Sequence, residues 1–84
     1  MNTTPADIMM KAHDLMGKQV TLYLAGDEDF GGVTVRFGQV VGVSESSVPA
    51  IKVKDYHDSS GLGVPWTLVL ATEVIDIKEY HPGA

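Results

Sequence analysis

The stretch from Gly17 to Gly38, GKQVTLYLAGDEDFGGVTVRFG, constrains the fold more than any other part of the chain. Two runs of alternating apolar and polar residues flank an acidic segment that is bracketed by glycines. The apolar members of the two runs are Val20, Leu22, Leu24, Val33, Val35 and Phe37. Alternation with period two is typical of a strand with one buried face. The stretch therefore predicts a β-hairpin with these six side chains on its buried face, and a solvated turn at Asp27, Glu28 and Asp29, which are costly to bury without partners.

Size and charge limit the function classes. At 84 residues the chain predicts one domain, residues 1–84, that buries roughly 60 to 65% of its unfolded surface, so we expect any ligand site to be shallow or shared between subunits. The absence of cysteine excludes disulfides, thiolate metal sites and a cysteine nucleophile. A formal net charge of -5 repels polyanions unless the cations cluster. No apolar run is long enough to span a membrane and no signal-peptide pattern is present, so we expect a soluble, cytoplasmic protein with no membrane partner.

Residues 5–16 predict a helix whose two ends are specified locally. Thr4 is a favourable N-cap, Pro5 suits the first helical position, and Gly17 suits the C-terminal end. One apolar stripe recurs at helical spacing: Ile8, Met9, Ala12, Leu15 and Met16. Such a stripe predicts that the helix packs on the sheet that starts at Lys18. An adaptable protein-binding face formed by the methionines is the alternative.

Three further strands are predicted after Gly38. This glycine interrupts an apolar run over 33–43, which indicates a bend or bulge in one long strand. Later strands are expected at 51–56, 64–71 and 74–80, separated by segments of loop composition at 44–49 and 58–63, and the tail 81–84 is expected to fray. The predicted fold class is mainly β: an N-terminal helix followed by a five-stranded small barrel over about 18–80.

This order of elements resembles SH3-like barrels with an N-terminal helix, and in particular the Sm and Sm-like proteins. The positions that carry the resemblance match the apolar and glycine residues of the family's first motif and the closing strand of its second: Leu24, Gly26, Phe30, Gly32, Val33, Val35, Phe37 and 74–77. The resemblance implies a small barrel that assembles into rings.

The same resemblance does not extend to RNA contacts. Where the family's first motif has an Asp and then an Asn that contact RNA bases, this chain has Gly38 and then Val41 and Gly42. Where the second motif has a basic residue followed by glycine, this chain has Ala71 and Thr72. RNA binding through these positions is therefore not implied.

The predicted fourth strand is apolar on both faces. Trp66, Leu68 and Leu70 share one face, and Val69 and Ala71 share the other. Either the helix covers the second face, or a neighbouring copy does so by pairing the fourth strand with the fifth, as in Sm-like rings, which also protects exposed strand edges. We predict a homo-oligomer whose interface contains these five residues.

A basic and aromatic cluster lies on the predicted third strand. By strand parity Lys52, Lys54 and Tyr56 share a face, Arg36 can join them from another strand, and His57 follows. Cations beside an aromatic ring suit a phosphate, a nucleotide or an acidic protein partner. These five residues form the predicted binding patch, and the alternative is that the lysines only keep an outer face soluble.

The sequence gives little support to metal binding or catalysis. Asp55, His57 and Asp58 carry metal-type ligands, but their spacing matches no established site. His57 beside Ser59 or Ser60 lacks a strained nucleophile turn. We therefore predict no metal, no cofactor, no catalytic residue and no enzymatic activity.

Two function hypotheses stay open. In the first, the domain is a small, oligomeric, non-catalytic binding or scaffold module that acts through protein contacts, in the style of phage and prophage accessory proteins, a link that has no motif behind it. In the second, the basic-aromatic patch binds a nucleotide or nucleic acid. Phosphate contacts weaken steeply with added salt whereas apolar contacts do not, so a salt titration distinguishes the two.

Overall fold

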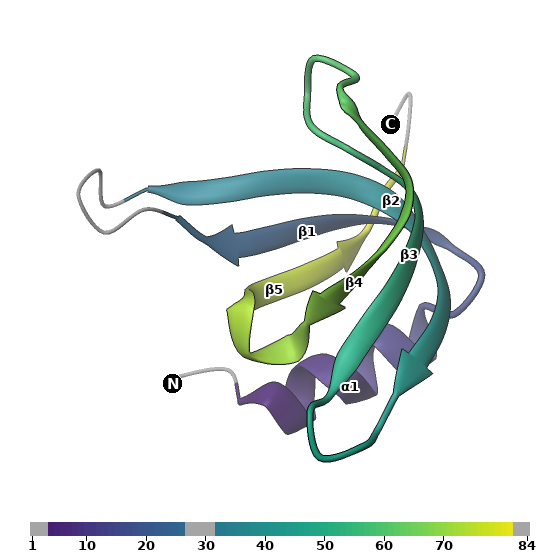
Figure 1. Ribbon diagram of the computed structural model, residues 1–84, viewed down its shortest axis with the longest axis vertical. Coiled ribbons are helices and arrows are strands. Elements are labelled where there is room, and N and C mark those ends of the chain that lie inside the picture. Colours follow the sequence, from purple (N-terminus) through teal and green to yellow (C-terminus); the bar gives the residue numbers. More distant parts are fainter. Residues whose placement is uncertain (1–3, 27–31, 82–84) are drawn as a thin grey trace.

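The computed structural model describes residues 4–26 and 32–81. Its elements are α1 (Pro5–Asp14), β1 (Gln19–Ala25), β2 (Val33–Ser44), β3 (Ala50–His57), β4 (Gly63–Leu70), the 3-10 turn η1 (Ala71–Glu73) and β5 (Val74–Glu79). The strands form one antiparallel sheet in the order β4-β3-β2-β1-β5 (Figure 1). This confirms a mainly-β fold with an N-terminal helix. Within the described residues the sheet is not closed, because β4 and β5 remain its two edges, so closure into a barrel is not confirmed.

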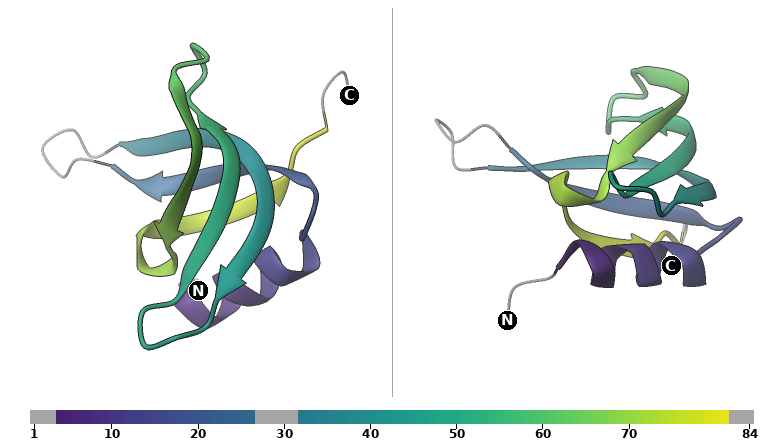
Figure 2. Two further views of the ribbon diagram at one scale, coloured as in Figure 1. Left: turned by 45° about the vertical axis from the view of Figure 1, so that its right-hand side comes forward. Right: turned by 60° about the horizontal axis from the view of Figure 1, so that its bottom comes forward.

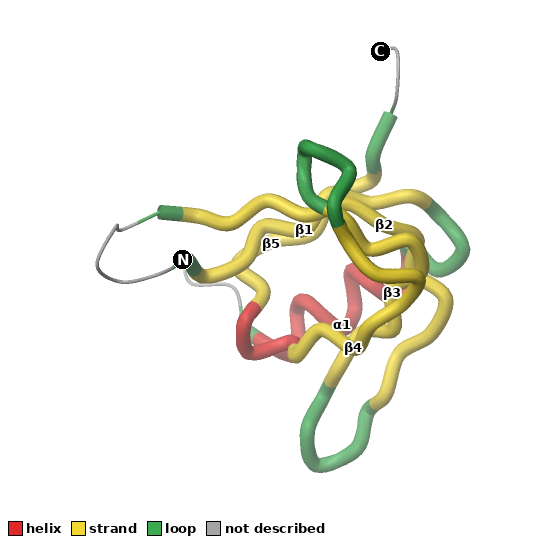
Figure 3. The backbone as a smooth tube through the Cα atoms, turned by 45° about the horizontal axis from the view of Figure 1, so that its top comes forward, coloured by secondary structure: helices red, strands yellow, loops and turns green. Residues whose placement is uncertain are grey.

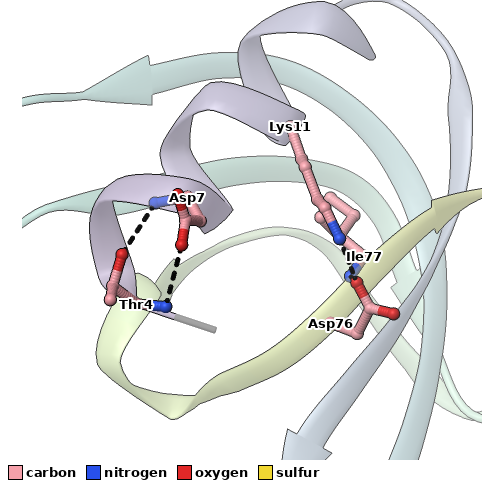
Figure 4. A network of polar contacts seen from close by, with 5 residues as sticks. All are labelled: Thr4, Asp7, Lys11, Asp76 and Ile77. Atoms are coloured by element: carbon pink, nitrogen blue, oxygen red, sulfur yellow. Dashed lines mark hydrogen bonds and ion pairs between the residues drawn. The ribbon is translucent and has the colours of Figure 1, made fainter. Parts of the chain in front are cut away.

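The ends of α1 follow the local sequence signals. The Thr4 hydroxyl accepts a hydrogen bond from the Asp7 N–H at 3.2 Å, and the Asp7 carboxylate accepts one from the Thr4 N–H at 3.3 Å (Figure 4). This capping box satisfies two N–H groups that the helix itself leaves unpaired. At the other end Gly17 adopts a φ of +81°, and its N–H donates to the Val40 carbonyl at 2.7 Å. The predicted start is confirmed, whereas the helix ends at Asp14, with Leu15 as its C-cap, two residues before the predicted end.

The helix lies across one end of the curled sheet (Figures 1, 2 and 3). Its buried residues Ile8, Met9 and Ala12 join a core to which every strand contributes. The strand and 3-10 members of that core are Val20, Leu22, Val40, Ile51, Val53, Val69, Ala71, Val74 and Ile77. Met10 and Met16 are exposed. Most of the predicted stripe is therefore core, as one would expect of a helix that covers a sheet.

An ion pair joins the exposed side of the helix to the edge strand β5. The Lys11 ammonium lies 2.8 Å from the Asp76 carboxylate (Figure 4). The same carboxylate oxygen accepts the Ile77 N–H at 2.8 Å. These hydrogen bonds, first the one from Lys11, hold the pKa of Asp76 below its usual range.

In the first half of β2, the face that points to the core is the opposite of the one that we predicted. Leu22 of β1 is fully buried, and its partner across the ladder is Arg36. Gly38 likewise stands opposite the buried Val20. Since directly paired residues share a face, Val33, Val35 and Phe37 lie on the outer face, and Val33 is 54% exposed. The burial predicted for β1 is confirmed at Val20 and Leu22, whereas that predicted for the first half of β2 is wrong.

Close approach of β3 explains why glycine occupies position 38. A Cβ atom there would lie 2.3 Å from Cγ1 of Val53 and 2.9 Å from the Lys54 carbonyl oxygen. Both distances are far below van der Waals contact. The β2–β3 register shifts twice, between Phe37 and Gln39 and between Val40 and Gly42, so the predicted irregularity is present.

Two sequence predictions lie outside the described residues. These are the solvated turn at Asp27, Glu28 and Asp29, with the neighbouring Phe30, and all but the first residue of the tail 81–84.

Candidate binding face on β3 and β4

The edge strand β4 presents a row of apolar side chains that nothing in the described structure covers. Val64, Trp66, Leu68 and Leu70 alternate along the strand and therefore share one face. All four are exposed, with 57% exposure for Trp66 and 54% for Leu68. Exposed apolar groups gathered in one place are typical of interaction surfaces.

Two lysines of β3 stand beside this row. Lys52 pairs with Leu68 and Lys54 pairs with Trp66 across the antiparallel ladder, so all four side chains lie on the same face. The Lys52 ammonium is 4.9 Å from the centroid of the Trp66 ring, a distance at which the ring face attracts a cation. We call Lys52, Lys54, Trp66, Leu68 and Leu70 the basic-apolar face. It combines residues that the sequence assigned to two separate sites.

The other side of β4 belongs to the core of the same chain. Val69 is 5% exposed and Ala71 is 1% exposed, and both pack in the cluster that contains the helix residue Ile8. Val69 and Ala71 therefore face the core that the helix helps to form, whereas Trp66 and Leu68 face away from it. Of the five predicted interface residues, the structure leaves Trp66, Leu68 and Leu70 accessible.

A bulge at Asp55 separates Tyr56 from the two lysines. Asp55 has a φ of +54°, rare for a residue with a side chain, and the β2–β3 register shifts by one residue at this point. Beyond this point Tyr56 packs against the core, whereas Lys52 and Lys54 are exposed. Tyr56 pairs with Val64 and Lys54 with Trp66, so the alternation along β3 is kept, but the half-buried Tyr56 side chain does not join the exposed lysines in one patch.

Arg36 also lies away from the lysines. It stands opposite the buried Leu22, is half-buried, and donates from Nη1 to the Val35 carbonyl at 2.9 Å. Its guanidinium lies beside the Tyr56 hydroxyl. Burial raises the pKa of that hydroxyl, and the charge of Arg36 opposes this effect in part. Arg36 and Tyr56 thus form a pair on the core side of the sheet.

His57 occupies a third place, in a group of aromatic rings. Its ring lies 5.5 Å from that of Phe37 at an angle of 30°, and Phe37 in turn lies 5.6 Å from Tyr80. Nδ1 of His57 is 2.6 Å from the Asp55 carbonyl oxygen, which requires Nδ1 to carry the proton and donate it. The five residues of the predicted patch are therefore divided among three locations.

Next to these rings lies a cleft of about 560 Å³. Four segments of the chain line it: Gln19 and Val20, Phe37 and Gly38, residues 57–61, and Tyr80. Sequence reasoning missed this site, because Phe37 had been assigned to the buried face and Tyr80 to the end of a strand. Its residues are far apart along the chain, so no motif spacing marks them.

The turn beside the cleft is built around Asp58. One oxygen of its carboxylate accepts from the Ser60 hydroxyl at 2.5 Å, the Ser60 N–H at 2.9 Å and the Leu62 N–H at 3.1 Å. These hydrogen bonds, first the one from the Ser60 hydroxyl, lower the pKa of Asp58. The Ser60 hydroxyl thus donates to a carboxylate and not to His57, and the described residues contain no group of three or more His, Asp or Glu placed to hold a metal ion.

Comparison with known proteins does not assign the chain to a family. No protein-family model matches the chain, and neither a curated protein nor a solved structure matches it. In the described part of the chain, no helix is both long and apolar enough to cross a membrane.

Proposed function

We propose that this domain is a non-catalytic protein-binding module that works as a homo-oligomer, assembled head to tail by pairing of β4 with β5 of the next copy. The observation that carries the proposal is the uncovered apolar row on an edge strand. An edge strand offers unpaired backbone N–H and C=O groups, and a strand added there places its side chains beside Trp66 and Leu68.

Both edges of the sheet support a contact of this kind. β4 and β5 are different surfaces, so a contact between them is heterologous and closes into a ring or extends into a filament. β5 presents the exposed Ile75, which offers an apolar contact to the row on β4. Pro65 lacks an N–H and so limits pairing near the start of β4, which leaves the segment from Trp66 onward for the contact.

An Sm-like arrangement is part of the same proposal. An N-terminal helix followed by five antiparallel strands, with β4 and β5 at the two edges, supports it. In the Sm-like proteins that the sequence resembles, these are the strands that join neighbouring subunits.

Nucleotide or nucleic-acid binding has weaker support. That function needs Arg36, Lys52, Lys54 and Tyr56 on one surface, and Arg36 and Tyr56 lie instead on the core side. Without Arg36 and Tyr56, the exposed cations of the patch are Lys52 and Lys54 beside Trp66, on a protein with a net charge of -5.

Analytical ultracentrifugation of the purified protein tests the proposal. The wild type is expected to sediment as a multiple of the 9.0 kDa chain. The double variant Trp66→Glu/Leu68→Glu is expected to sediment as a folded monomer, because both side chains are exposed and the new charges repel an apolar partner. The matched control is Leu62→Glu, which changes a leucine that is 75% exposed in the turn before β4.

Three results would contradict the proposal: a wild-type monomer at the highest soluble concentration, a double variant that keeps the wild-type mass, or equal dissociation of the Leu62→Glu control. Far-UV circular dichroism of each variant verifies that the fold is retained. Repeating the run at high salt separates an apolar interface, which persists, from one that depends on charge.

A further inference from the structure

No residue of β4 or β5 is among the described residues that line the cleft beside the aromatic rings. At about 560 Å³ its volume is within the range of roughly 300 to 1,000 Å³ that is typical of small-molecule sites. The turn after β3 forms one wall, and the start of β1 together with the segment after β5 forms another. In Figures 1 and 3 the turn after β3 and the segment after β5 lie at the same end of the molecule.

Three aromatic side chains line this cleft. The Phe37 ring contacts both of the others: it is stacked with His57 and tilted relative to Tyr80. Tyr80 is held in place by its N–H, which donates to the Gln19 carbonyl at 2.8 Å. The faces of the Phe37 and Tyr80 rings are electron-rich.

The charged groups at the cleft favour one class of ligand over another. Among the described residues that line it, none is Lys or Arg, and Asp58 contributes a carboxylate. Two cations adjoin lining residues in the chain: Lys18 lies 3.6 Å from the Glu79 carboxylate, which offsets its charge, and Arg36 adds in part to the lowered pKa of Asp58. A carboxylate beside aromatic faces disfavours anions and favours cations.

We propose that this cleft binds a small organic ammonium ion whose alkyl groups rest on the rings of Phe37, His57 and Tyr80, with Asp58 at its rim. The ring faces attract the cation and the alkyl groups bury apolar surface, so charge and shape act together. A neutral molecule of the same shape retains the apolar contact and loses the attraction of the rings and of the carboxylate. This difference makes the proposal testable.

The experiment compares choline with its neutral isostere 3,3-dimethyl-1-butanol in NMR titrations of the ¹⁵N-labelled full chain. Choline is expected to cause saturable shifts at the Gly38 and Gly61 amides, while the Trp66 indole, which does not line the cleft, stays unchanged. We expect choline to bind roughly 2- to 30-fold more tightly than the isostere, the range that corresponds to a cation–π contribution. Equal binding of the two molecules, or no saturable shift with choline, would overturn the proposal.

A pair of variants at Tyr80 tests the role of the rings. Tyr80→Leu is expected to lower the affinity for choline several-fold, whereas Tyr80→Phe, which keeps the ring, retains it. Asp58→Asn is expected to reduce the preference for choline over the isostere, and this ratio stays informative even if the turn loosens. If Tyr80→Leu and Asp58→Asn both bound choline as the wild type does, the proposed ammonium site would be refuted. Since the readout is ligand binding, its failure is distinguishable from a failure of the oligomer proposal, which is measured as mass.

Discussion

The ammonium nitrogen of Lys52 lies 4.9 Å from the centroid of the Trp66 ring, although the residue directly opposite Trp66 on β3 is Lys54. The contact is therefore diagonal across the ladder, within reach of a long side chain. It brings a cation of β3 against the apolar row of β4, so that the lysines and the row form one surface. Lys54 stands directly opposite the same ring and is therefore an internal control for the contact that Lys52 makes.

The diagonal contact predicts unequal energetic coupling of the two lysines to Trp66. A double-mutant cycle with Lys52→Gln and Trp66→Leu is expected to give about 0.5 kcal/mol of coupling, the value for an exposed cation–π pair. The same cycle with Lys54→Gln is expected to give close to zero. Urea unfolding measures both, and coupling that is larger for Lys54 would contradict the contact.

The helix is expected to stabilise the sheet through its buried face. Ile8→Ala removes a fully buried side chain and is expected to lower the free energy of unfolding by about 2 to 5 kcal/mol. Met10→Ala, on the same helix but 68% exposed, is expected to change it by less than about 0.5 kcal/mol. If chemical denaturation gave equal losses for the two variants, the helix would not pack as described.

Two glycines of β2 are expected to differ sharply in their tolerance of alanine. Gly38→Ala places a methyl group against Val53 and the Lys54 carbonyl, so we expect a loss of about 1 to 3 kcal/mol. At Gly42 the nearest atom to a new Cβ would be 3.7 Å away, an ordinary contact, so Gly42→Ala is expected to be neutral or stabilising by up to about 1 kcal/mol. Thermal unfolding of the pair is the measurement, and the reverse order of stabilities would count against this approach of β2 and β3.

The ion pair between Lys11 and Asp76 predicts a stability difference that depends on pH. The pKa of Asp76 is lower in the folded protein than its ordinary 3.8, so the pair stabilises the fold above that value and loses its effect as the pH falls through the folded pKa. Since both side chains are partly exposed, Lys11→Gln is expected to cost about 0.2 to 1 kcal/mol at neutral pH and close to nothing in acid.

Lys54→Gln is the control for this ion pair, because the described residues include no carboxylate that forms an ion pair with Lys54. Its effect on the free energy of unfolding is expected to stay the same across the pH range. A loss for Lys11→Gln that persisted in acid would show that the lysine acts through packing and not through charge.

Features that depend on near neighbours in the chain were predictable from the sequence alone. Thr4 and Asp7 specify the start of α1 because capping involves residues within one turn, and Gly17 adopts the positive φ of the turn that follows the helix. The number, order and mainly-β character of the strands follow from alternation and from turn-forming residues. The apolar character of both faces of the fourth strand was likewise visible in its residues.

Tertiary structure decided which face of each strand is buried and which residues meet. Alternation defines two faces but does not say which one points inward; the pairing of Leu22 with Arg36 and the approach of β3 to Gly38 made that choice. The β2–β3 register shifts near Asp55, and Tyr56 packs against the core while Lys52 and Lys54 stay exposed, a difference that alternation alone does not reveal. The basic-apolar face and the aromatic cleft both arise from register and curvature, since they join residues that lie on different strands and are brought together only when the sheet folds.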